Sequence, residues 1–126
     1  MNYVKLALLA IAAITVVSGA AQMFAPGVVL HVVGGEATPA TMHFFAIIGM
    51  FMVLFGGLMW QSLRAAPPLA IPLFWAALQK VGAALAVGLG VSRGLFGPVA
   101  LVVASFDLFS GILALWYWNA IRGSAP

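Results

Sequence analysis

The chain has 126 residues, of which 65% are hydrophobic and only 6% are charged, whereas an ordinary soluble domain carries about 25% charged residues. Five basic and two acidic side chains cannot solvate the surface of a compact domain, so the composition excludes a soluble globular enzyme and indicates a bilayer as the solvent. The chain has no cysteine, which excludes disulfides and thiolate metal sites, and its net charge of +3 is too dispersed to bind nucleic acid.

The first apolar stretch, residues 4–24, has the length of about 20 residues that a helix needs to cross a bilayer. Lys5, the apolar run after it and the sequence SGAAQ are also typical of a secretory signal peptide. We expect this segment to be retained as a span or membrane anchor. The piece from Pro26 to Thr38 is too short to span, and we interpret residues 28–33 as an interfacial or re-entrant turn that ends at Gly34-Gly35.

Three further spans follow at residues 41–63, 69–91 and 96–120, with proline and glycine at their boundaries. Continuous backbone hydrogen bonding in lipid favours helices over barrel strands, which would be shorter and would alternate. The sequence therefore predicts an all-α fold, in which residues 1–126 form a single four-helix transmembrane bundle with a short turn between the first two spans.

The basic residues predict the orientation of this bundle. Four spans place Lys5, Arg64 and Arg122 on one side and Arg93 alone on the other. Because lysine and arginine accumulate on the cytoplasmic side, we expect both termini there, in a membrane such as the bacterial inner membrane. The tryptophans and tyrosines lie at the same end as the three cations and form one aromatic belt: Tyr3, Trp60, Trp75, Trp116, Tyr117 and Trp118.

Two charged residues, Lys80 and Asp107, lie deep inside the third and fourth spans. A hairpin that turns near Arg93 brings them to one level, because Lys80 is 13 residues before Arg93 and Asp107 is 14 after it. The residues at helical spacing around both are mostly small, so the two backbones can approach closely. We predict an ion pair. A proton relay, a substrate counter-ion and a pore element remain open, but a neutral pair favours a structural clip.

The opposite end of the bundle carries a possible polar site at its rim, made of Gln22, His31, Glu36, His43 and Arg93. Two histidines and a carboxylate would suffice for a metal, but their spacing matches no helical ligand pattern, so we predict hydrated side chains and no metal. We also predict a rim ion pair between Glu36 and Arg93. We expect no haem, since only His43 lies near a span.

Several segments are similar to the small four-helix membrane proteins of the DoxX-like and BphX-like group. These are SGAAQMFAP, HFFAIIGMFMVLFGGLMW, LQKVGAALAVGLG and ASFDLFSGILALW, which together extend over nearly the full length. The matching positions are Gly19, Pro26, Gly49, Gly56, the region of Lys80 and Gly82, and Asp107. The resemblance implies a compact bundle with cytoplasmic termini, of a group whose members mostly have no assigned activity. In its better-known members the role is that of a membrane subunit of a quinone-linked oxidoreductase, and no catalytic residue is carried over.

The leading hypothesis for function is a non-catalytic membrane subunit or small bundle. It would bind partner proteins, or a hydrophobic molecule such as a quinone or lipid, inside the bilayer, and it would act as a homo-oligomer or in a larger complex. The first alternative is an oligomeric transporter or channel lined by Lys80 and Asp107. The second is an intramembrane enzyme that uses the outer polar rim, although no recognisable nucleophile or paired carboxylates support it.

Overall fold

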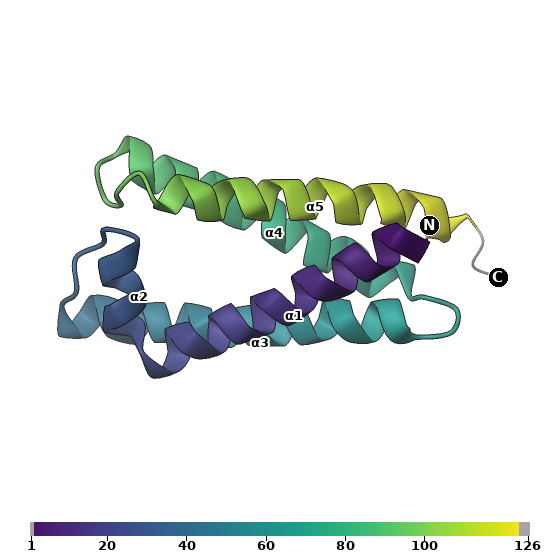
Figure 1. Cartoon of the computed structure of the whole chain (residues 1–126), viewed down its shortest axis with the longest axis horizontal. Helices are drawn as coiled ribbons and strands as arrows, with labels where there is room; N and C mark the ends of the chain where they lie inside the picture. Colours follow the sequence, from purple (N-terminus) through teal and green to yellow (C-terminus); the bar gives the residue numbers. More distant parts are fainter. Residues whose placement is uncertain (1, 124–126) are drawn as a thin grey trace.

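The computed structural model describes residues 2–123, and within this range the fold is entirely helical, without strands. The predicted all-α class is confirmed. The five helices are α1 (Asn2–Phe24), α2 (Pro26–Val32), α3 (Pro39–Arg64), α4 (Ala70–Ser92) and α5 (Ala100–Arg122), and Figure 1 shows α1, α3, α4 and α5 as the long members of a bundle.

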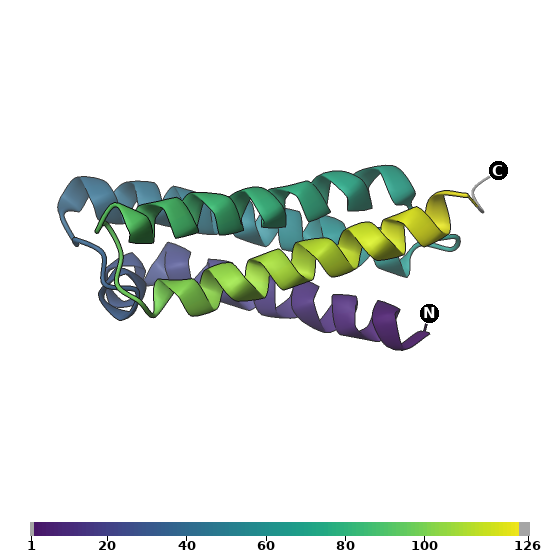
Figure 2. The same ribbon diagram turned by 90° about the horizontal axis from the view of Figure 1, so that it is seen from above.

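The bundle consists of two tightly packed helix pairs, α1 with α3 and α4 with α5. Figure 2 shows α4 lying over α3 and α5 lying over α1, and these two contacts join the pairs. Within the first pair, Gly19 and Gly49 face one another. A Cβ built at Gly19 would lie 2.6 Å from the carbonyl oxygen of Gly49, and a Cβ built at Gly49 would lie 2.6 Å from the carbonyl oxygen of Gly19. Glycine is therefore what allows the α1 and α3 backbones to approach.

The hydrophobic core occupies one half of the bundle. It lies toward the end at which α1 begins and α3 ends, which we call the cationic end because it carries Lys5, Arg64 and Arg122. Figure 1 shows α1 and α5 close together there and diverging toward α2. The buried core residues are Leu8, Leu9, Ile11, Ala12, Met59, Leu63, Leu73, Ala76, Ala77, Ala114 and Tyr117.

The long helices coincide with the predicted spans to within two residues, except at the start of the fourth. That span was expected to begin at residue 96, but α5 begins at Ala100. Residues 97–99 first form a tight turn, in which the N–H of Ala100 donates to the carbonyl of Gly97 at 3.1 Å. At α3, Pro39 follows the capping residue Thr38, whose hydroxyl accepts from the N–H of Thr41 at 3.1 Å. Pro39 thus starts this helix, as proline does at a first helical position.

The segment interpreted as a turn between the first two spans contains a short helix, α2. It ends before Gly34, whose φ of +74° is a left-handed conformation that glycine adopts without strain. Gly34 lies against Gly97 in the α4–α5 loop, and the N–H of Gly97 donates to the carbonyl of Val33 at 2.9 Å. This backbone bond joins the two helix pairs at the end opposite the cationic end, which we call the α2 end.

The outer surface of the bundle is strongly apolar. Large side chains such as Ile71 and Val102 are 75% and 70% exposed. The helices α1, α3, α4 and α5 are each long and apolar enough to cross a bilayer. Length, composition and exposure together indicate an integral membrane protein.

Candidate functional site

Lys80 is the centre of the polar contacts inside the bundle. Its ammonium nitrogen lies 3.4 Å from Oδ1 of Asp107, across the α4–α5 pair, so the structure brings the two predicted partners together. Only 4% of Lys80 is exposed. Within residues 2–123 this is the one salt bridge.

The ammonium group has a second hydrogen-bond partner that the sequence did not indicate. Lys80 donates a hydrogen bond of 2.6 Å to the hydroxyl oxygen of Thr15 on α1, and Thr15 in turn donates to the carbonyl of Ile11 at 2.8 Å. The hydroxyl therefore uses both its acceptor and its donor capacity. A single lysine thus connects both helix pairs, because α1 belongs to one and α4 and α5 to the other.

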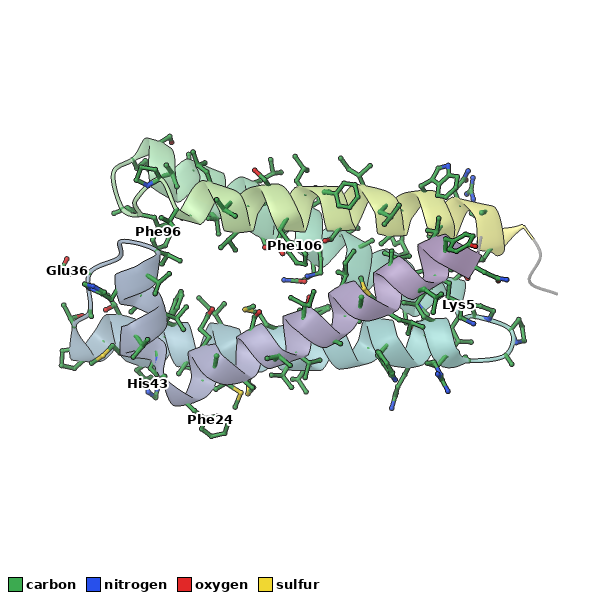
Figure 3. The ribbon with its side chains drawn as sticks, viewed as in Figure 1. Lys5, Phe24, Glu36, His43, Phe96 and Phe106 are labelled. Atoms are coloured by element: carbon green, nitrogen blue, oxygen red, sulfur yellow. The ribbon has the colours of Figure 1, made fainter. Side chains whose placement is uncertain are left out.

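Close packing of α4 on α5 supports the ion pair. A Cβ built at Gly111, one turn after Asp107, would lie 3.1 Å from the carbonyl oxygen of Ala77 and 2.7 Å from a methyl carbon of Val81. The ring of Phe106 lies 5.5 Å from the Lys80 nitrogen, close enough for a cation–π contact, and Figure 3 shows Phe106 midway along the bundle. Small residues bring the helices together, as the sequence predicted, and an aromatic face adds to the neighbours of the ammonium group.

This arrangement is suited to holding helices in register. The lysine is buried and its charge is matched by one carboxylate, whose side chain is 16% exposed. Charges inside a span normally face protein or water and pair with one another. Its three residues come from three helices of the same chain, α1, α4 and α5, so the Lys80–Asp107–Thr15 cluster fits a structural clip.

Gln22 does not belong to an outer rim. It is 6% exposed, and its side-chain amide donates to the carbonyl of Phe45 on α3 at 2.9 Å. Gln22 lies one turn after Gly19, on the face of α1 that packs on α3, which explains its burial. It contributes to the α1–α3 contact instead of a site at the membrane surface.

The other four predicted rim residues, His31, Glu36, His43 and Arg93, are exposed at the α2 end. Figure 3 shows Glu36 and His43 there, and in the described part of the chain the expected ion pair between Glu36 and Arg93 is not formed. The loops meet instead through the backbones around Gly34 and Gly97. Among residues 2–123 no three histidine or acidic side chains are grouped as metal ligands.

A second feature is a groove of about 350 Å³ on the surface of the α1–α3 pair. We call it the apolar groove. Three of its lining residues are small, namely Ala12, Ala13 and Gly57. The other three are larger, namely Val16, Val17 and Trp60. A Cβ built at Gly57 would meet no other atom within 4 Å, so this glycine leaves open space.

Four apolar helices and one buried, internally neutralised ion pair define the class, a compact helical membrane protein. Comparison of the chain with protein-family models, with curated proteins and with solved structures finds no match.

Proposed function

We propose that the protein is a non-catalytic accessory subunit of a membrane complex. It binds a partner protein, or a hydrophobic molecule such as a quinone or lipid, within the bilayer. The observation that carries this proposal is the apolar groove, because Ala12, Ala13 and Gly57 leave an uncovered hollow on a surface that faces lipid. In lipid, helices associate where small residues allow close approach, so an unfilled hollow of this composition fits an apolar occupant.

The charged residues of the spans support a binding role over transport. A path lined by Lys80 and Asp107 would need the lysine to face the path, whereas Lys80 is 4% exposed and is held by Asp107 and Thr15. The surface left for recognition is apolar. An accessory subunit of the DoxX-like kind, associated with a quinone-linked oxidoreductase, is the form of this proposal that the sequence resemblance favours.

We expect Gly57→Leu to fill the apolar groove and to remove its occupant. The matched control is Gly82→Leu on α4, where an added Cβ also meets nothing within 4 Å but lies outside the groove. Native mass spectrometry of protein extracted in mild detergent should show an additional bound mass, polypeptide or small molecule, in the unaltered protein and in Gly82→Leu. Gly57→Leu should lose most of it. Equal retention by both variants would contradict a role for the groove.

The proposed orientation places the cationic end in the cytoplasm of a bacterium, with the α2 end outside the inner membrane. It can be tested cleanly because the chain has no cysteine. An impermeant maleimide should label Glu36→Cys in intact cells, whereas Ala65→Cys, in the α3–α4 loop, should be labelled only after lysis. The reverse pattern would place the termini outside.

A further inference from the structure

A hollow of about 540 Å³ opens at the cationic end, between the start of α1 and the end of α3. We call it the basic hollow, and it is lined by Asn2, Lys5, Leu6, Leu9 and Arg64. The two helices run in opposite directions, which brings Lys5 and Arg64 to the same end. Figure 3 shows Lys5 at this end of the molecule.

The positive charge of the basic hollow is not matched by any acidic side chain of this protein. The chain has two acidic residues. Asp107 is bonded to Lys80 midway along the bundle, and Glu36 is exposed at the α2 end. In residues 2–123, Lys5 and Arg64 make no hydrogen bond or ion pair through their side chains. The first turn of α1 has no acidic residue either, so the partial positive charge of this helix end adds to that of Lys5.

The rest of the lining shows what kind of anion fits. Leu6 and Leu9 are apolar, and Leu6 is 62% exposed on the lipid-facing surface. A ligand here meets two cations and an asparagine amide at the membrane–water interface, and leucine side chains on the bilayer side. These neighbours match a phospholipid, whose phosphate is joined through glycerol to acyl chains. Basic pockets between transmembrane helices bind such lipids on the cytoplasmic side, where the proposed orientation places the cationic end.

We propose that the basic hollow binds the head group of an anionic phospholipid. Lys5 and Arg64 bind the phosphate, with Arg64 offering the planar donor pair that matches phosphate oxygens. Asn2 meets the polar remainder of the head group, and Leu6 and Leu9 contact the start of the acyl chains. The basic hollow and the apolar groove share no lining residue, so lipid binding at the basic hollow does not depend on the proposed role as an accessory subunit.

The experiment compares lipid binding by the full chain in nanodiscs of phosphatidylcholine with a small fraction of phosphatidylglycerol. We expect native mass spectrometry to show phosphatidylglycerol retained in preference to phosphatidylcholine, and Lys5→Gln/Arg64→Gln to lower that preference about tenfold. The control is Arg122→Gln, at the same end but outside the hollow. Arg122 already donates to Asn119 at 2.9 Å and stacks on Trp118.

Each alternative has its own result. If Arg122→Gln lowers the preference as much as the double variant, the attraction is a general property of the cationic end and the proposal is wrong. If inorganic phosphate displaces the lipid and binds equally well alone, the ligand is a free phosphate and the lipid assignment is wrong. If the double variant folds poorly, the single variants Lys5→Gln and Arg64→Gln are measured instead, and each should lower the preference for phosphatidylglycerol in part. If the preference is unchanged in both single variants, the proposal is wrong.

Discussion

Replacing Lys80 by methionine is expected to lower the free energy of unfolding by about 3–5 kcal/mol, the usual effect of removing one partner from a buried pair. The change leaves the Asp107 carboxylate inside a span with no cation, and it also removes the bond to Thr15. The measurement is SDS-induced unfolding in detergent micelles, followed by the loss of helical circular dichroism. Asp107→Leu should be damaging in the same way, because it leaves the ammonium group unpaired.

The double variant Lys80→Met/Asp107→Leu is the control for this prediction. It removes both charges and fills the space with apolar side chains, and such replacements of a buried pair are often neutral or stabilising. We therefore expect it to recover most of the stability lost in either single variant. Single variants that unfold like the unaltered protein would show that the pair does not hold these helices.

Thr15→Val separates the two contacts of Lys80. Valine keeps the shape of threonine but lacks the hydroxyl oxygen that accepts from the ammonium group at 2.6 Å. Hydrogen bonds to charged groups contribute about 1.5–3 kcal/mol, so we expect a smaller loss than for Lys80→Met. The exchanged pair Lys80→Asp/Asp107→Lys should recover only part of the free energy of unfolding that Lys80→Met or Asp107→Leu loses. Aspartate is too short to replace lysine, and the Thr15 hydroxyl already donates to Ile11.

The ion pair could be predicted from sequence because both residues belong to one hairpin. Counting from Arg93 gives their relative depth without knowledge of any other helix. Thr15 could not be found in this way, since it reaches Lys80 across the bundle from α1, which packs mainly on α3. Thr15 and Ser18 are both hydroxyl residues inside the first span, and they differ by about 60° around the helix and about 4.5 Å along it. Both the rotation and the depth of α1 relative to α4 therefore decide which of them reaches Lys80.

The side-chain directions of the predicted rim residues could not be read from the sequence for a related reason. Position along the chain places Gln22, His31 and Glu36 near one end of the bundle, but it does not give the direction of a side chain. Gln22 is turned into the α1–α3 contact by the approach of Gly19 to Gly49. Residues around His31 form a helix where an interfacial or re-entrant turn was expected, and the His31 side chain is exposed on this helix. The direction of each side chain depends on how the helices pack on one another, and the residues near it in the sequence do not determine that packing.

Adding one methyl group at Gly19 is expected to separate α1 from α3. The new Cβ of Gly19→Ala would lie 2.6 Å from the carbonyl oxygen of Gly49 and 2.9 Å from the backbone nitrogen of Val53. Backbone atoms cannot turn aside as a side chain can, so the whole helix must shift. Overpacking of this kind lowers the free energy of unfolding by about 1–3 kcal/mol and sometimes more. The Gln22 bond to Phe45 would be lost with the same movement.

The same substitution at Gly88 should have the opposite sign, which makes it the matched control. Nothing lies within 4 Å of a Cβ at Gly88, and alanine is favoured over glycine inside a helix by about 1 kcal/mol. We therefore expect Gly88→Ala to unfold at the same or higher SDS concentration than the unaltered protein, and Gly19→Ala at a lower one. Gly49→Ala should resemble Gly19→Ala, and the double variant should lose less than the sum, because one displacement of α1 relieves both clashes. Full additivity would mean that the two glycines do not share a contact.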